Sequence, residues 1–178
     1  MYASLNPDGY LNLNNGILNL ETLILTPASH QFFFTYRINV NYQAEDKPTP
    51  IWNKFISESV SSSDKDHLLQ WLNGLFRGNR SNEMMLWIYG PSNSGKSVML
   101  EIIKQLFRHG MSNVGISSFG MTFGLEPIAK AFVNIDADAN DNCFGNNTTR
   151  VFKNLTDEDC DISVNGKNIK EVKIYQYL

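Results

Sequence analysis

The chain has 178 residues, of which 42% are hydrophobic and 12% aromatic, so it fits one globular domain or one domain with a small appendage. Its formal net charge of −3 argues against nonspecific nucleic-acid binding through bulk charge, and only a local basic patch remains open. The N-terminus lacks the pattern of a signal peptide, and no apolar run approaches the roughly 18 residues that span a bilayer. Cys143 and Cys160 fit free thiols of a reducing compartment. We therefore expect a cytoplasmic protein with no membrane partner.

Residues 1–80 are predicted to form a small α+β region. Alternating apolar residues on both sides of Asn15 and Gly16 predict a hairpin, because both residues tolerate positive φ, and the segment 31–42 is expected to continue as strand. After a polar linker, Thr49 can cap a helix that starts at Pro50. Asp64 can cap a second helix that ends near residue 78. We expect the aromatic residues of these helices to belong to the core rather than to form base-stacking platforms.

Residues 81–178 follow an α/β pattern. The apolar run 84–89 is typical of a buried parallel strand, and it is followed by a polar loop and by an amphipathic helix that Gly110 ends. Further strands are expected in 112–119 and 130–136, a short helix in 148–155, and a second hairpin around Asn165 and Gly166. This order predicts an α/β fold of the P-loop, AAA+-like type, with a parallel sheet core and helices on both faces.

The loop between the first strand and its helix carries the pattern GxxxxGK[ST]. Its glycines let the backbone turn around an anion, so that successive N–H groups and the helix N-terminus point at the phosphates. Lys96 is placed to reach the β- and γ-phosphates, and the Ser97 hydroxyl is placed to ligate Mg²⁺. Chance would produce this pattern in fewer than about one chain in a hundred of this length, so an ATP–Mg²⁺ site is favoured over a plain flexible loop. The candidate nucleotide-binding residues are Gly90, Pro91, Ser92, Asn93, Ser94, Gly95, Lys96 and Ser97.

Two carboxylates, Asp136 and Asp138, follow the apolar residues of the strand predicted at 130–136. Alternation along a strand puts both side chains on the same side. There one carboxylate could hold the Mg²⁺ shell through water, and the other could orient the attacking water. The alternative is an acidic loop without catalytic function. The candidate catalytic residues are Lys96, Asp138 and Asp136, and the candidate Mg²⁺ residues are Ser97, Asp136 and Asp138.

The order of these segments resembles that of a known family. Before the loop, Asn15, Gly16, Tyr42, Pro50, Trp52 and Phe55 follow the order of an N-terminal motif. After it, "FVNIDAD" resembles a Walker B strand, and "FKNLTDEDCDISVNGK" resembles the next motif. In this order the segments are similar to the superfamily 3 helicase module of phage, plasmid and large-DNA-virus primase–helicases. The resemblance implies an ATP-dependent DNA helicase that acts on single-stranded DNA as a hexameric ring, with a primase domain or other replication proteins as partners.

The resemblance also implies roles for single residues. Asp138 matches the catalytic acid, with Ala137 where the family usually has the adjacent acid. Lys153 belongs to the motif after Walker B, and Lys167 matches the hairpin residue that contacts single-stranded DNA. Lys170 lies beside it, where phosphate contacts are accessible, although a solvated strand face is the alternative. The sequence is expected to stop before the family's sensor asparagine and arginine finger, so that a strand beside the P-loop strand is missing.

Two other functions remain open. A truncated nucleotide-binding or assembly module would bind nucleotide without hydrolysis, and steady ATPase turnover with single-stranded DNA would separate it from a motor. A small nucleotide kinase would need a basic lid, but the chain after the loop contains only two arginines, Arg108 and Arg150.

Overall fold

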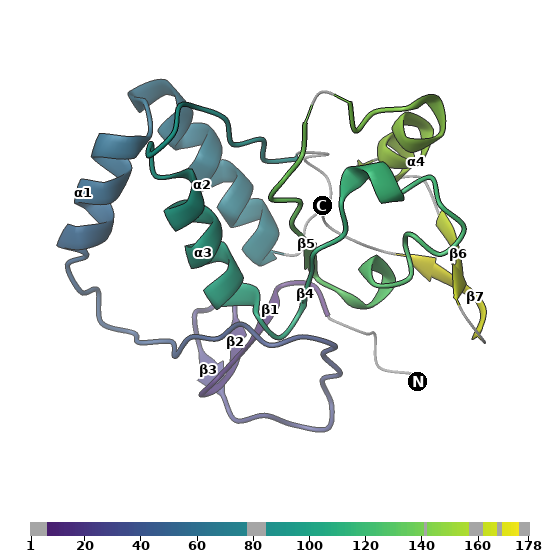
Figure 1. The fold of residues 1–178 in the computed structure, drawn as a ribbon. Helices are drawn as coiled ribbons and strands as arrows, with labels where there is room; N and C mark the ends of the chain where they lie inside the picture. Colours follow the sequence, from purple (N-terminus) through teal and green to yellow (C-terminus); the bar gives the residue numbers. More distant parts are fainter. Residues whose placement is uncertain (1–6, 78–84, 141, 157–161, 167–168, 175–178) are drawn as a thin grey trace.

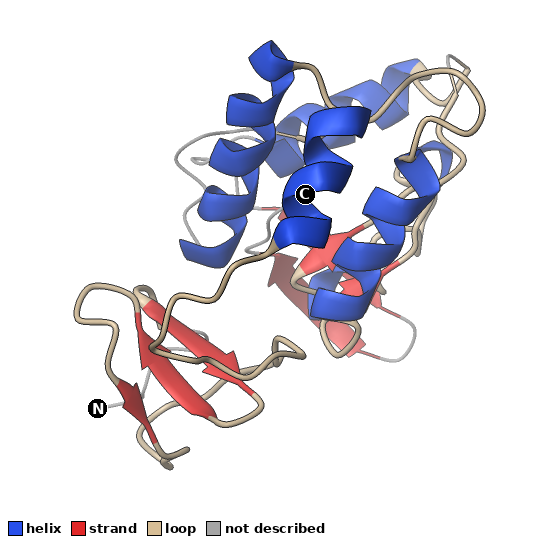
Figure 2. Ribbon diagram, turned by 90° about the vertical axis from the view of Figure 1, so that its left-hand side faces the viewer, coloured by secondary structure: helices blue, strands red, loops and turns tan. Residues whose placement is uncertain are grey.

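The computed structural model describes residues 7–77, 85–140, 142–156, 162–166 and 169–174, and for the last two ranges it describes the backbone alone. Three helices, α1 (Pro50–Ser59), α2 (Ser62–Arg77) and α3 (Lys96–Phe107), pack together next to a small antiparallel sheet (Figures 1 and 2). The C-terminal helix α4 (Asn146–Thr156) and a hairpin lie on the other side of the molecule. None of the helices in the described part of the chain has the length and hydropathy of a membrane span.

The N-terminal hairpin is confirmed, with its turn one residue earlier than predicted. Leu13 pairs with Gly16, so the two turn residues are Asn14 and Asn15. Gly16 has φ 147°, and a Cβ there would collide with the carbonyl oxygen of Thr26 in the third strand. A glycine is therefore needed for the close approach of that strand and not for the turn itself. The three strands pair in the order β1 (Tyr10–Leu13), β2 (Gly16–Asn19) and β3 (Leu25–Thr26).

The segment 31–42 does not form the strand that the sequence predicted. Its backbone is irregular, and Ile38 forms an isolated parallel bridge with Leu13 of β1. Asparagine side chains bind several of its backbone groups instead. Asn12 Nδ2 donates to the carbonyl of Tyr36 at 2.9 Å, and Asn15 both donates to the Tyr42 carbonyl at 2.9 Å and accepts from its N–H at 3.0 Å. These contacts compete with a regular ladder.

Both helices of the first region are present, and the cap of the second differs from the prediction. Helix α1 begins at Pro50 as expected, but Thr49 makes no side-chain cap hydrogen bond. The hydroxyl of Ser61 accepts from the backbone N–H of Asp64 at 3.2 Å and donates to the Asp64 carboxylate at 2.6 Å. Ser61 is therefore the capping residue of α2, and Asp64 is its partner in the first turn.

The second region contains short strands. In the described part of the chain, the strands that pair in parallel are β4 (Met111–Ser112) and β5 (Val133–Asn134). The strand predicted at 84–89 is not present: the described residues 85–89 have no regular secondary structure, and Trp87 and Tyr89 are 42% and 85% exposed. The segment faces a cavity instead of a paired neighbour, which explains why it forms no ladder. The extended parallel sheet with helices on both faces stays a prediction.

The last elements agree with the sequence. The helix predicted at 148–155 is α4, and the second hairpin consists of β6 (Ile162–Gly166) and β7 (Ile169–Ile174), which pair antiparallel with a bulge between Val164 and Gly166. Cys143 is a buried free thiol, whereas Cys160 lies outside the described residues.

The main core does not follow the predicted division near residue 80. Phe107 at the end of α3 is 1% exposed, and its ring centroid lies 5.6 Å from that of Phe76 in α2 and 5.4 Å from that of Phe132. Leu11 and Tyr36 of the N-terminal region belong to the same cluster of buried residues. A second, smaller core lies around α4 and consists of Ile116, Phe119, Leu125, Ile128, Cys143 and Leu155.

Candidate functional site

The predicted phosphate loop runs from the irregular segment 85–89 into the first turn of α3. Gly90, Asn93 and Gly95 have positive φ angles of 152°, 62° and 88°, so the backbone turns sharply three times within six residues. Gly95 is the N-cap of α3, and it makes no side-chain cap hydrogen bond. Within the described structure, the N–H groups of Lys96 and Ser97 have no acceptor, as is usual for free helix N-termini. The loop therefore offers uncapped donors and glycine turns, which fit an anion.

The side chain of Lys96 forms hydrogen bonds with the loop residues that precede it. Its ammonium group donates to the carbonyl oxygens of Gly90 at 2.7 Å and Pro91 at 2.6 Å, and it lies 3.4 Å from the Ser94 hydroxyl. These partners are neutral. A phosphate oxygen in their place would carry negative charge, so that its hydrogen bond with the ammonium group would also be an ion pair. The loop thus holds the lysine next to the position where the sequence predicts phosphates.

Helix α1 packs directly against the loop, a contact that the motif did not predict. A Cβ atom added to Gly95 would lie 2.8 Å from Ser59 Oγ and 3.2 Å from Phe55 Cε2. Any side chain at position 95 would therefore collide with α1, in addition to the strain at φ 88°. Neither Ser59 nor Phe55 was a candidate site residue. The only signal in the sequence was the helical spacing that places both on one face of α1.

The two candidate carboxylates differ in their contacts. Asp136 is half-buried, and it accepts from the backbone N–H of Ile116 at 2.8 Å and from that of Asp138 at 3.1 Å. Asp138 is exposed. Because β5 ends at Asn134, both aspartates follow the strand, and strand alternation does not fix their relative directions. Strand alternation is therefore not what places them, but both residues line one cavity of about 570 Å³ together with Lys104.

The described structure shows no hydrogen bond or ion pair between the two aspartates and Lys96 or Ser97. Within the same residues, no group of three or more His, Cys, Asp and Glu side chains gathers. A nucleotide-bound Mg²⁺ takes few ligands from the protein, so this finding leaves the Mg²⁺ prediction open.

Asn134 is a structural residue of the site that the sequence analysis passed over. Its Oδ1 accepts from the Ser112 hydroxyl at 2.8 Å and from the Val114 N–H at 2.9 Å, while its Nδ2 donates to the Val114 carbonyl at 2.9 Å. Asn134 and Asp136 together hold the chain from residue 112 to residue 116 against the end of β5. An isolated Asn in a strand-like run gave no signal of this function.

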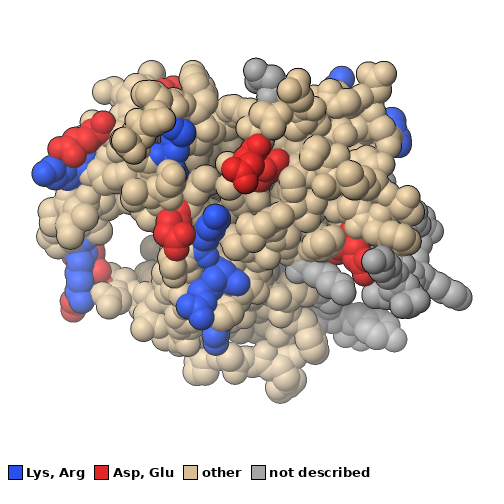
Figure 3. All heavy atoms as spheres, in the orientation of Figure 1, with Lys and Arg blue, Asp and Glu red and all other residues tan. Residues whose placement is uncertain are grey.

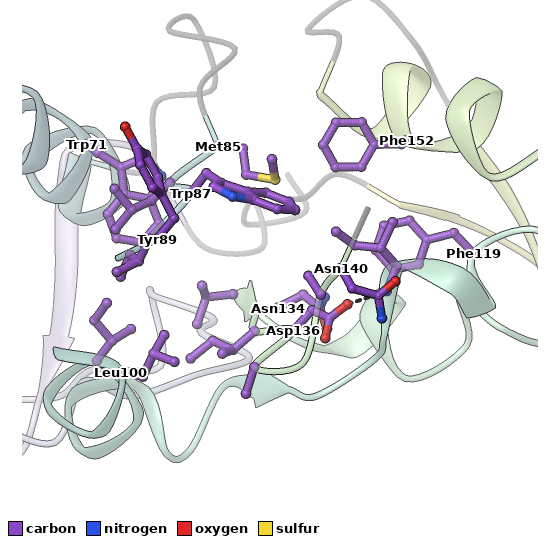
Figure 4. A pocket seen from close by; sticks show the side chains of 18 residues that line it. Trp71, Met85, Trp87, Tyr89, Leu100, Phe119, Asn134, Asp136, Asn140 and Phe152 are labelled. Atoms are coloured by element: carbon purple, nitrogen blue, oxygen red, sulfur yellow. Dashed lines mark hydrogen bonds between the residues drawn. The ribbon is translucent and has the colours of Figure 1, made fainter. Parts of the chain in front are cut away.

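A second cavity, of about 330 Å³, lies between the segment that leads into the loop and the end of β5 (Figure 4). Trp87 and Tyr89 lie on one side, and Asn134 and Asp136 lie on the opposite side. Phe152 of α4 lines it as well, and the ring of Phe144 bridges Trp87 and Phe152 at centroid distances of 6.3 and 5.3 Å. The walls are thus mostly apolar, with polar groups at the carboxyl end of β5.

The candidate DNA-binding lysines lie in the C-terminal part of the chain. Lys153 is in the last turn of α4, and Lys170 is in β7, whereas Lys167 lies outside the described residues. On the face shown in Figure 3, basic side chains lie close to acidic ones, and most of the surface carries neither. Among the residues described on that face, the basic side chains near its centre form one short group, with acidic side chains next to it.

Two family models match separate parts of the chain. Residues 4–61 match the model of a family described as "D5 N terminal like", a region that is found in phage and viral primase–helicase proteins and supports a replication protein of that kind. Residues 88–178 match the model described as "Family of unknown function (DUF5906)". This match covers just over half of the chain, and the protein belongs to that family. A comparison with curated proteins finds no match.

Proposed function

We propose that the chain is the ATP-binding module of a replication protein of the phage and viral primase–helicase type. The observation that carries the proposal is the loop 90–97, with its glycine turns, its uncapped helix N-terminus and its inward-facing Lys96. The D5 N-terminal-like match supports the replication context, because proteins of that kind act on DNA.

In this proposal the loop residues do most of the binding. Lys96 exchanges the carbonyls of Gly90 and Pro91 for oxygens of the β- and γ-phosphates, and the N–H groups from Gly95 to Ser97 bind the remaining charge. Ser97 is exposed and would ligate Mg²⁺, which neutralises charge on the phosphates when it is bound. Asp138, which is exposed, would orient the attacking water.

The cavity beside the loop supports the proposed P-loop fold. In the described structure, residues 85–89 form no backbone hydrogen bonds, and one edge of β5 faces the same cavity. Strand pairing at this place, as in the proposed sheet, would satisfy these backbone groups. A hexameric ring on single-stranded DNA, contacted by Lys153, Lys167 and Lys170, belongs to the same proposal.

Thermal melting with and without ATP and Mg²⁺ tests nucleotide binding. Ligand at 100 times its Kd stabilises a protein by about 2.7 kcal/mol, which for a chain of this size raises Tm by about 5–10 °C. We expect this shift in the wild type and in Lys65→Ala, which removes an exposed lysine of α2, but not in Lys96→Ala. Equal shifts in wild type and Lys96→Ala would refute the proposed site.

A second candidate function is nucleotide binding without hydrolysis, in a module that serves assembly. The contacts of Asp136 favour it, because this carboxylate accepts from two backbone N–H groups and thereby has a structural function at the turn 112–116. Steady ATP turnover by the purified chain with single-stranded DNA, above that of Lys96→Ala, would support the motor. Nucleotide binding without such turnover would support the second candidate.

A further inference from the structure

The end of the phosphate loop that enters α3 is covered by aromatic residues of α1. Phe55 and Ser59 lie against Gly95, at the distances given above, and the Trp52 ring lies 6.2 Å from that of Phe55, between centroids. These residues are spaced three and four apart, so they share one face of the helix. Trp52 and Phe55 pack against the main core, as the sequence predicted, but both are only half-buried, so part of each ring stays accessible.

The direction of a bound nucleotide follows from the loop. The N–H groups at the start of α3 face the α- and β-phosphates in a loop of this type, while Lys96 reaches the β- and γ-phosphates. The nucleoside is attached to the α-phosphate, so it leaves the loop at the Gly95 end. The aromatic side chain that the structure places against that end is Phe55, with Trp52 next to it.

We propose that α1 supplies the nucleoside subsite of this ATP site, with Phe55 and Trp52 stacking against the base. Ser59 Oγ, next to Gly95, is placed to donate to the sugar or to the α-phosphate. The D5 N-terminal-like region, to which α1 belongs, would then bind the ligand itself. The inference rests on the proposed function, because it requires the phosphates to lie in the loop 90–97.

The test compares two ligands, ATP and inorganic tripolyphosphate, each with Mg²⁺ and measured by calorimetry on the full chain. Tripolyphosphate has the same phosphate chain but no base to stack. In Phe55→Ala and Trp52→Ala we expect ATP to bind about 5- to 100-fold more weakly, the range for loss of one base–aromatic stack, while tripolyphosphate binds as in the wild type. Ile51→Ala is the matched control, since Ile51 is 85% exposed on the same helix and should leave both affinities unchanged.

The outcomes separate this inference from the function on which it rests. If both ligands weaken equally in Phe55→Ala, α1 only positions the loop, and the nucleoside subsite is refuted. If the wild type binds ATP no more tightly than tripolyphosphate, the subsite is refuted while phosphate binding stands. If the wild type binds neither ligand, both proposals fail. Should Phe55→Ala not fold, Phe55→Leu keeps the apolar volume, and the same two ligands decide.

Discussion

The two aspartates after β5 should respond very differently to removal of their carboxylates. Asp136 accepts hydrogen bonds from the N–H groups of Ile116 and Asp138, at 2.8 and 3.1 Å, and thereby holds the turn that follows β4. Asp138 is exposed, and its carboxylate makes no hydrogen bond within the described residues. Asp136→Ala should therefore destabilise the protein, and Asp138→Ala should leave its stability almost unchanged.

The magnitude follows from the two donors that Asp136→Ala leaves behind. Ile116 is 4% exposed, and a buried N–H that loses its acceptor costs about 1–3 kcal/mol. The N–H of Asp138 belongs to an exposed residue and can bond to water instead, so the loss of its hydrogen bond to Asp136 adds little to the cost. The expected total is about 2 kcal/mol, which lowers Tm by about 4–8 °C for a chain of this size. Asp138→Ala should stay within about 0.5 kcal/mol of the wild type.

Thermal and urea unfolding without nucleotide measure these differences. Asp136→Asn keeps one acceptor oxygen in the same place, so its loss of stability should fall between those of the wild type and Asp136→Ala. Equal melting temperatures for the two alanine variants would refute the structural function of Asp136. The carboxylate would then be free for a metal, as the resemblance to Walker B strands implies.

Two further predictions concern positions outside the loop. Gly124→Ala should lower the free energy of unfolding by more than about 2 kcal/mol, because the added Cβ would collide with the Ser118 carbonyl. A Cβ at Gly145 meets nothing, so Gly145→Ala is the control and should melt like the wild type. Equal Tm values for the two variants would contradict the packing at Gly124. Asn15→Ala should lower the free energy of unfolding, measured in urea, by about 1–2 kcal/mol, because both hydrogen bonds to Tyr42 are lost. The segment 31–42 should also be cut faster by a protease, and an unchanged rate would show that Asn15 does not fix this segment.

The sequence predicted those elements whose signals are local. The helices α1 to α4 and both hairpins follow from apolar spacing and from proline, glycine and asparagine positions. The segment 31–42 was mispredicted because its backbone bonds to groups distant in sequence, among them the carbonyl of Leu106 and the side chains of Asn12 and Asn15. Its apolar and aromatic residues predicted a strand, but hydrogen bonds to distant asparagine side chains compete with regular strand pairing.

For the candidate site, the motif predicted which residues form the loop but not what surrounds it. Glycines at positions 90 and 95 were predicted for backbone turning, and their positive φ angles agree. The contact between Gly95 and α1 depends on how two distant helices pack, and single-sequence patterns contain no such information. The strand ends at Asn134, where the turn at 112–116 bonds to Asn134 and Asp136, and this long-range contact was not visible in the sequence either.

The phosphate loop is fixed from two sides, and both depend on the N-terminal region. Helix α3 begins in the loop and ends at Phe107, which is buried with residues of α2 and of the segment that contains Tyr36. Helix α1 contacts the loop directly at Gly95. A polypeptide that started at residue 81 would keep the whole GxxxxGK[ST] pattern but would lose both supports and expose Phe107 and Ile103 to water. The main core therefore includes residues from both sides of position 80, and the shape of the loop 90–97 depends on residues that lie outside the motif.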